Sequence, residues 1–246
     1  MVRQCDLIVP LGGNCSVAMQ LSWRNKRPFA LGLDWTYMRD ASPIDYLAHA
    51  FETNFADFAM KENLCDISTA YPKTYTSPAY KDSVSGLELP HQFRKYSTSD
   101  TWYEEDGAKL KRRIARMLSM VAECKSVLFI LATAFEYEED KALRLCRTIR
   151  KTFDGTTCSF RFMMFNAGRD DICDDGEGVV FQRIARPVHK YDFYATSAIW
   201  SFLDDIDVLK CRQEKMSSLD RLRYRLWKHL GKKLKRKGVK LNFVFK

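Results

Sequence analysis

Near the start of the chain, a short apolar run is followed by a glycine pair and a cysteine. Residues 7–11 (LIVPL) predict a buried strand, which the two glycines end. Residues suited to helix capping stand on both sides of Cys15, so this cysteine is predicted at a helix N-terminus. The unpaired N–H groups and the dipole of a helix favour an anion there, either a ligand phosphate or a thiolate. The candidate ligand-binding residues are Gly12, Gly13, Asn14 and Ser16, and the structural alternative is an ordinary strand–helix turn around a small buried cysteine.

Three further sites carry residues that could bind or react. Asp34 and Trp35 end an apolar segment, and either a ligand-binding pair or a structural acid at a strand end fits them. His91 lies in residues 63–100, whose prolines and polar residues predict a long irregular excursion of the functional kind; the alternative is a surface histidine. Arg113 lies on the basic face of a predicted helix, which is either solvated or positioned to meet a phosphate.

The elements that position these residues follow from hydrophobic periodicity. Apolar residues repeat at helical spacing from Leu110 to Val121, and residues 126–132 form a continuous apolar strand. Further helices are predicted over 42–55, 138–153 and 197–206, and further strands over 160–165 and 179–185. The alternation predicts an α/β domain over residues 1–210: a three-layer, Rossmann-like fold with a mainly parallel sheet and helices on both faces. Ligands bind such sheets beyond the strand C-termini, where we expect the Cys15 turn, Asp34, Thr133 and Asn166.

The composition narrows the class of protein. The chain has 246 residues, 46% of them hydrophobic, which is enough for a substantial core. No run approaches the roughly 20 apolar residues of a membrane span, and no signal peptide is evident, so a cytoplasmic protein is predicted. The eight cysteines occur singly, which favours reduced thiols over disulfides or zinc ligands. Acids at 170, 171, 174 and 175 could hold a divalent cation, but nearby glycines favour a solvated turn, so no metal or cofactor is predicted.

The positive charge is concentrated at the C-terminal end. From Lys210 onward there are 14 Lys and Arg against two acids, whereas the remainder has a small acidic excess. Residues 211–246 are therefore predicted to form a separate basic, amphipathic helical tail. We expect residues 216–246 to attach the protein peripherally to an anionic inner membrane surface. The alternative is that its leucines dock on the body, and nucleic acid is disfavoured because the body is acidic and lacks a recognition motif.

Several motifs in the first half of the chain resemble one family. Residues 11–15 (LGGNC) precede Ala18 and Leu21, and an Asp34-Trp35 pair follows. Further along stand HQF at 91–93, RRIAR at 112–116 and VLFI at 127–130. In this combination they resemble the family described as putative papain-like cysteine peptidases, over about residues 6–132. The family pattern has an aromatic residue where this chain has Leu33 and an acid where it has Gln92.

The resemblance implies a thiol nucleophile, a histidine base and an orienting polar group. Carried over to this chain, these are Cys15, His91 and Asp34. A helix-terminal thiolate would be stabilised, and the histidine would accept or hold its proton. The papain fold itself is not expected, because helix–strand units follow His91 where papain relatives have a β-rich subdomain.

Three functions are therefore compatible with the sequence. The first is a cysteine-dependent hydrolase or acyl transferase. The second is a glycosyltransferase that uses a nucleotide sugar in surface-glycan assembly, with the glycine turn as its phosphate site. The third is a non-catalytic module tethered to a membrane. The substrate, whether a small molecule, a glycan or a peptide, is not defined by these patterns.

Overall fold

The computed structural model describes residues 4–27, 29–71, 77–93, 102–133, 135–168, 171–185 and 200–209. The predicted tail, residues 211–246, lies outside the described residues, as does the part of the predicted 197–206 helix before Trp200. Every helix in the described ranges is too short or too polar to cross a bilayer.

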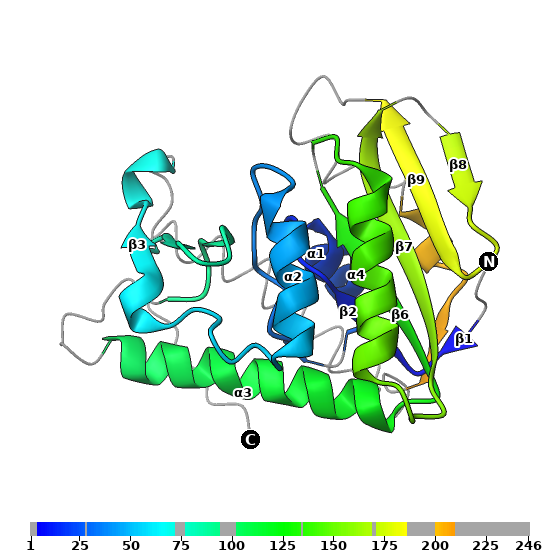
Figure 1. Ribbon diagram of the computed structural model, residues 1–246, viewed down its shortest axis with the longest axis horizontal. Coiled ribbons are helices and arrows are strands. Elements are labelled where there is room, and N and C mark those ends of the chain that lie inside the picture. The colour runs from blue at the N-terminus through cyan, green and yellow to red at the C-terminus, as the bar shows by residue number, and fades with distance from the viewer. Residues whose placement is uncertain are drawn as a thin grey trace, which may run out of the picture. The chain divides into compact units, whose positions relative to one another are not determined.

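A five-stranded sheet forms the centre of the described body (Figure 1). Its strand order is β2-β6-β7-β9-β8, and the first four strands run parallel. The edge strand β8 pairs antiparallel with β9. The bounds are β2 Leu7–Pro10, β6 Ser126–Ala132, β7 Ser159–Gly168, β8 Asp171–Asp174 and β9 Val179–Ala185. The prediction of an α/β fold with a mainly parallel sheet is confirmed.

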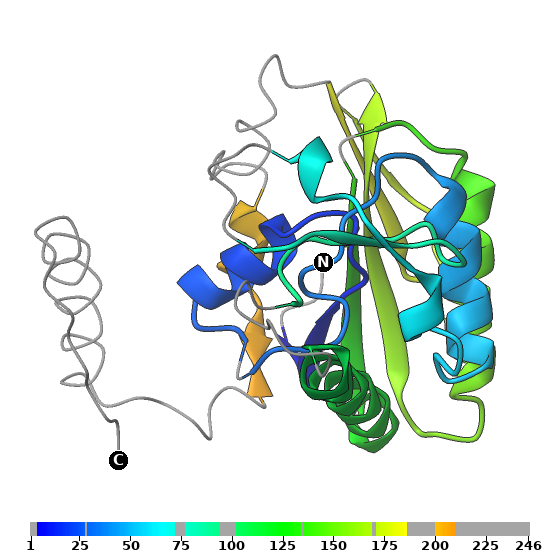
Figure 2. The ribbon, with the colours of Figure 1, turned by 90° about the vertical axis from the view of Figure 1, so that its left-hand side faces the viewer.

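Helices lie on both sides of this sheet. Figure 2 shows α2 (Ser42–Glu52) and α4 (Glu139–Thr152) together on one side and α1 (Ser16–Trp23) on the other. The long helix α3 (Trp102–Glu123) leads into β6. The parallel strands follow one another in chain order, without the reversal that defines a doubly wound sheet. The Rossmann-like three-layer arrangement therefore stays a prediction.

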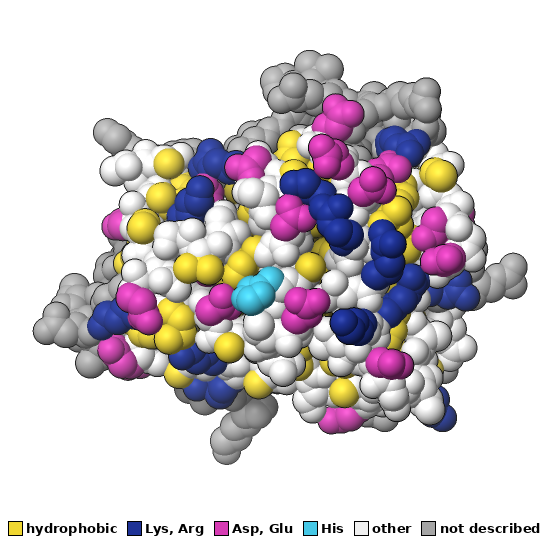
Figure 3. Space-filling view, viewed as in Figure 1, with side chains coloured by type: hydrophobic (Ala, Val, Ile, Leu, Met, Phe, Trp, Pro, Cys, Tyr) yellow, Lys and Arg dark blue, Asp and Glu magenta, His cyan; other side chains and the backbone are white. Residues whose placement is uncertain are grey.

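The core lies where α2, α3 and α4 cover the sheet. Strand β6 is buried from Val127 to Ala132, as its unbroken apolar run predicts. Phe129 at its centre stacks on Phe162 of β7, with ring centroids 5.3 Å apart. The outer face of α4 is basic, and Figure 3 shows Lys and Arg side chains gathered over it. Two of these cations, Lys141 and Arg144, pair with Asp45 of α2 and so join the two helices.

Two predicted elements differ in the structure. Helix α2 ends at Glu52, three residues early, because Asn54 and Phe55 have positive φ angles of 52° and 60° that no right-handed helix accepts. The excursion over 63–100 also contains regular structure. The short helix η1 (Lys61–Asn63) leads into it, and it holds the short helix η2 (Ser68–Ala70) and a three-stranded antiparallel sheet. That sheet consists of β3 (Leu64–Asp66), β4 (Tyr80–Asp82) and β5 (Glu88–Leu89).

A strand that follows β9 in the chain lies beside the first strand. Strand β10 (Asp207–Val208) pairs parallel with β1 (Gln4–Cys5), which precedes β2 by one residue. A 3₁₀ turn, η3 (Ser201–Leu203), stands where the sequence predicted a helix through Ile206. The prediction was wrong for these residues, because Trp200, Phe202 and Leu203 are all buried. When neighbouring apolar residues are all buried, their spacing in the sequence does not by itself indicate a helix.

Candidate active site

Cys15 lies in the turn between β2 and α1, at the C-terminal edge of the parallel strands. It is the N-cap residue of α1, and its side chain is half-buried. Asn14 fixes this position from both directions: its Nδ2 donates to the Ala132 carbonyl at the end of β6, and its Oδ1 accepts from the Ser16 amide, both at 2.8 Å. The strand–turn–helix placement of Cys15 that the sequence predicts is confirmed.

The two glycines of this turn are required by its backbone and packing. Gly12 and Gly13 have φ angles of 87° and 90°, which favour glycine. A Cβ at Gly12 would overlap Thr36, and one at Gly13 would overlap the carbonyl oxygen of Ala132. The space that glycine leaves is therefore filled by the protein itself. At these two positions the glycines permit close packing of the chain, and their predicted role in ligand binding stays a prediction.

Burial disfavours the thiolate form that is predicted for Cys15. Desolvation raises the pKa of the Cys15 thiol, and its own backbone N–H opposes this to a smaller extent. The resting form at neutral pH is therefore the thiol, which needs a base before it can attack. Ser16 is also buried, and its Oγ has no hydrogen-bond partner among the described residues.

Asp34 is fully buried and holds the loop that precedes it. Its Oδ2 accepts a 2.7 Å hydrogen bond from the Leu31 amide and pairs with Arg27 Nη2 at 2.6 Å. Its Oδ1 has no hydrogen-bond partner within the described ranges. The carboxylate predicted to orient His91 therefore positions Arg27 in this structure. Arg27 stands only seven residues before Asp34 in the sequence, but no role was predicted for it.

Desolvation raises the pKa of Asp34 to about 6, although Arg27, the Leu31 amide and Arg113 all lower it. The folded protein thus binds a proton between about pH 4 and 6 that the unfolded chain releases. Stability from this group is complete below about pH 4 and is lost as the pH rises through 6. The difference from the ordinary value of 3.8 corresponds to about 3 kcal/mol.

Asparagine cannot titrate, so we expect the stability of the Asp34→Asn variant to rise relative to that of the wild type as the pH rises. Urea unfolding at pH 4 and at pH 7 measures this: the free energy of unfolding of the wild type minus that of the variant should fall by up to about 3 kcal/mol. A difference that grows with pH would mean that the ion pair with Arg27 outweighs the desolvation of Asp34.

His91 and Trp35 are in contact next to this ion pair. Their ring centroids lie 5.5 Å apart with an interplanar angle of 74°, and the guanidinium of Arg27 lies 5.5 Å from the Trp35 ring. His91 is exposed, yet the desolvation that it does experience lowers its pKa. The imidazole is thus neutral at pH 7, the form that can accept a proton.

Arg113 joins the same group through Gln92. Its Nη1 donates to Gln92 Oε1 at 3.0 Å, and Gln92 Nε2 donates to the Gly32 carbonyl at 3.5 Å. The structure thus brings Asp34, Trp35, His91 and Arg113 into one cluster around Arg27. Thr36, which follows Trp35 in the chain, packs against Gly12 of the Cys15 turn.

Other predicted polar positions are structural. The Oγ of Thr133 donates to the Phe135 and Phe165 carbonyls and is buried. The side chain of Asn166 lies outside the described residues. Asp174 and Asp175 accept hydrogen bonds from the amides of residues 176, 177 and 179, so they cap the β8–β9 turn. The described residues contain no group of three or more His, Cys, Asp or Glu that could hold a metal.

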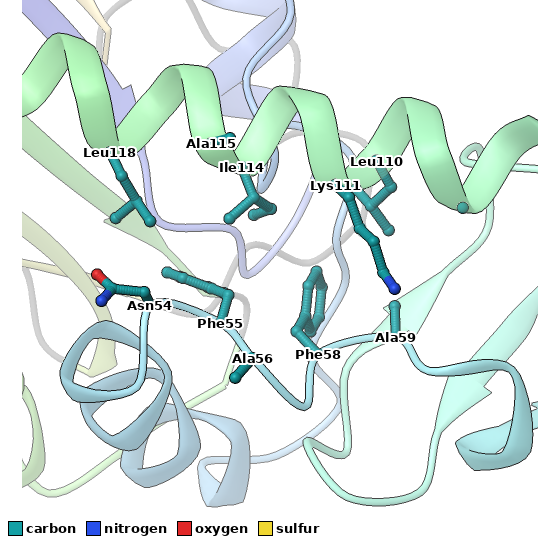
Figure 4. A pocket seen from close by; sticks show the side chains of 11 residues that line it. Asn54, Phe55, Ala56, Phe58, Ala59, Leu110, Lys111, Ile114, Ala115 and Leu118 are labelled. Atoms are coloured by element: carbon teal, nitrogen blue, oxygen red, sulfur yellow. The ribbon is translucent and has the colours of Figure 1, made fainter.

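A pocket of about 380 Å³ lies away from this cluster, between α3 and residues 54–59 (Figure 4). In Figure 4, Leu110, Ile114 and Leu118 point from α3 towards Phe55 and Phe58. The pocket is apolar, with Lys111 as the ionisable side chain of its lining, and none of the predicted site residues lines it. Cys15, Asp34 and His91 lie outside its lining, so the Cys15 turn remains the candidate for chemistry.

The comparisons with known proteins agree with the motifs. A family model described as putative papain-like cysteine peptidase matches residues 6–167, more than half of the chain. The chain belongs to this family. No curated protein and no solved structure matches it. In this member of the family, the described elements that follow His91 are α3-β6-α4-β7, so the expectation that helix–strand units replace a β-rich subdomain is confirmed.

Proposed function

We propose that the protein is a cysteine-dependent hydrolase with Cys15 as its nucleophile. The observation that carries the proposal is the placement of this thiol at the N-cap of α1, on a turn locked by Asn14. Family membership supports the same reaction class. A hydrolase needs a nucleophile that is held rigidly and yet reachable, and a half-buried N-cap cysteine meets both requirements.

In the proposed reaction, neutral His91 accepts the proton of the Cys15 thiol as the sulfur attacks an acyl carbon. The S–C bond forms while the carbonyl π electrons move to oxygen, and the dipole of α1 favours the resulting oxyanion. The leaving group then departs with the proton from His91, which leaves a thioester. Water hydrolyses the thioester; an acceptor amine or alcohol in its place would make the protein an acyl transferase.

The other two functions predicted from the sequence have less support. The packing of Gly12 and Gly13 against protein atoms explains these glycines without a ligand, and family membership gives no support to a nucleotide-sugar transferase. Membrane attachment through residues 216–246 stays a prediction, since that segment lies outside the described residues, and a cytoplasmic location is equally a proposal.

Two thiol reagents test the proposal, because they depend on different properties. At pH 7 iodoacetamide should modify the exposed Cys65 and Cys173 before Cys15, whose pKa is raised by burial. An acyl-type electrophile such as a peptidyl acyloxymethyl ketone should instead label Cys15 first, because His91 accepts the proton during attack. Peptide mapping by mass spectrometry measures both orders.

The matched control compares two histidines. His91→Ala should slow the labelling of Cys15 by the acyl-type electrophile, whereas His49→Ala should not, since His49 on α2 faces Asp57 at 3.4 Å. Labelling of Cys65 and Cys173 alone, or an equal effect of the two histidine variants, would contradict the proposed site.

A further inference from the structure

Three arginines from two parts of the chain lie near one another, and one of them, Arg27, contacts Trp35. Arg27 comes from the loop after α1, and Arg113 and Arg116 stand one turn apart on α3. The Arg116 guanidinium lies 5.0 Å from the Phe29 ring, next to the segment that Arg27 and Asp34 hold. Arg113 is half-buried and interacts electrostatically with both other arginines.

Close packing brings α3 to this segment. Gly32 lies directly on Ile114, so that a Cβ at residue 32 would overlap the Ile114 side chain. Gln92, itself buried, links Arg113 to the Gly32 carbonyl. The two arginines of α3 are therefore held beside the 27–35 loop, and chance proximity of long flexible side chains does not account for the cluster.

The charges in this cluster are unbalanced. Asp34 pairs with Arg27, and it is the acid that acts most strongly on Arg113. The second acid that acts on Arg113, Asp106, lies 3.9 Å from Lys109. Arg27 is fully engaged, because its other nitrogens donate to the Phe29 carbonyl and the Ser22 hydroxyl. Positive charge thus remains on Arg113 and Arg116.

We propose that Arg113 and Arg116, backed by Arg27, bind an oxyanion, a phosphate or carboxylate group of the substrate. Guanidinium groups present paired N–H donors that match the oxygens of these anions, and partial desolvation strengthens the interaction. Arg27 also contacts Trp35, whose ring in turn contacts His91. If Cys15 is the nucleophile proposed above, the substrate is an acyl compound with a negatively charged group near the scissile bond; this part of the inference rests on the proposed function.

Binding can be measured without turnover. We expect the full-length protein to bind inorganic phosphate or succinate in calorimetric titrations at constant ionic strength, and the tighter of the two identifies the anion. Arg113→Gln and Arg116→Gln should each weaken this binding about tenfold, the effect of losing one charge-assisted hydrogen bond. Arg112→Gln removes the same charge from an exposed neighbouring position of α3 and should change it by less than about twofold.

Two results would overturn the proposal. One is an equal loss in all three variants, which would indicate general attraction to the basic chain, and the other is the absence of binding of either anion by the wild type. Arg116 is exposed, so its variant keeps the test valid if Arg113→Gln fails to fold. Cys15→Ser should retain anion binding. A protein that binds the anion but carries no reactive Cys15 would refute the hydrolase and leave the anion site standing.

Discussion

Replacement of Cys15 by serine is expected to lower the kcat for any amide, ester or thioester that the protein hydrolyses by at least about 10³-fold. A serine hydroxyl is far less acidic than a thiol, so neutral His91 cannot deprotonate it to a comparable extent. The fold should survive, because the turn is held by Asn14 and by the backbone of Cys15, whose carbonyl accepts from the Met19 amide at 3.0 Å. The measurement is kcat and KM for the first substrate found in a screen of acyl compounds, with thermal unfolding as a check on the fold.

Cys158 supplies the matched control. It is half-buried like Cys15, and burial raises its pKa as well, to about 11. It precedes β7, however, and so lies at the N-terminal end of a parallel strand, away from the edge that carries Cys15. Cys158→Ser should leave kcat unchanged. Full turnover by Cys15→Ser would exclude a thiol nucleophile and favour a transferase that uses no covalent intermediate.

Much of the fold could be predicted because local patterns determine it. Residues 127–132 are apolar throughout, and a strand covered on both sides buries all six of them at once. The amphipathic stripe of α3 likewise follows from residues three and four apart. The small sheet β3–β4–β5 was missed because strands of two or three residues are too short to show an alternating pattern.

The candidate site was only half predictable, for a related reason. The position of Cys15 depends on neighbours in sequence, and it was predicted correctly. The contact between Asn14 and Ala132 spans 118 residues, and the link between Gln92 and Gly32 spans 60. No local pattern encodes such contacts. The family resemblance suggested that Asp34 orients His91, and the structure pairs this carboxylate with Arg27, seven residues before it.

Gly13→Ala tests the other essential feature of the turn, its close contact with β6. The substitution should destabilise the fold by at least about 3 kcal/mol, from the left-handed backbone, the overlap and the strained hydrogen bond between Asn14 and Ala132. The residue has a φ of 90°, and its Cβ would overlap a backbone carbonyl that belongs to β6 and cannot rotate away. Urea unfolding measures the loss, and electrophile labelling should show that Cys15 is displaced.

Gly155→Ala separates the two causes of this loss. Gly155 has nearly the same backbone angle, a φ of 87°, but a Cβ there would meet no atom within 4 Å. Its substitution should therefore cost only the left-handed backbone penalty, about 1–2 kcal/mol, and leave the labelling of Cys15 unchanged. Equal losses in the two variants would mean that the turn tolerates a side chain at Gly13. The glycine pair would then have room for a ligand, and the phosphate-binding role predicted from the sequence would regain its support.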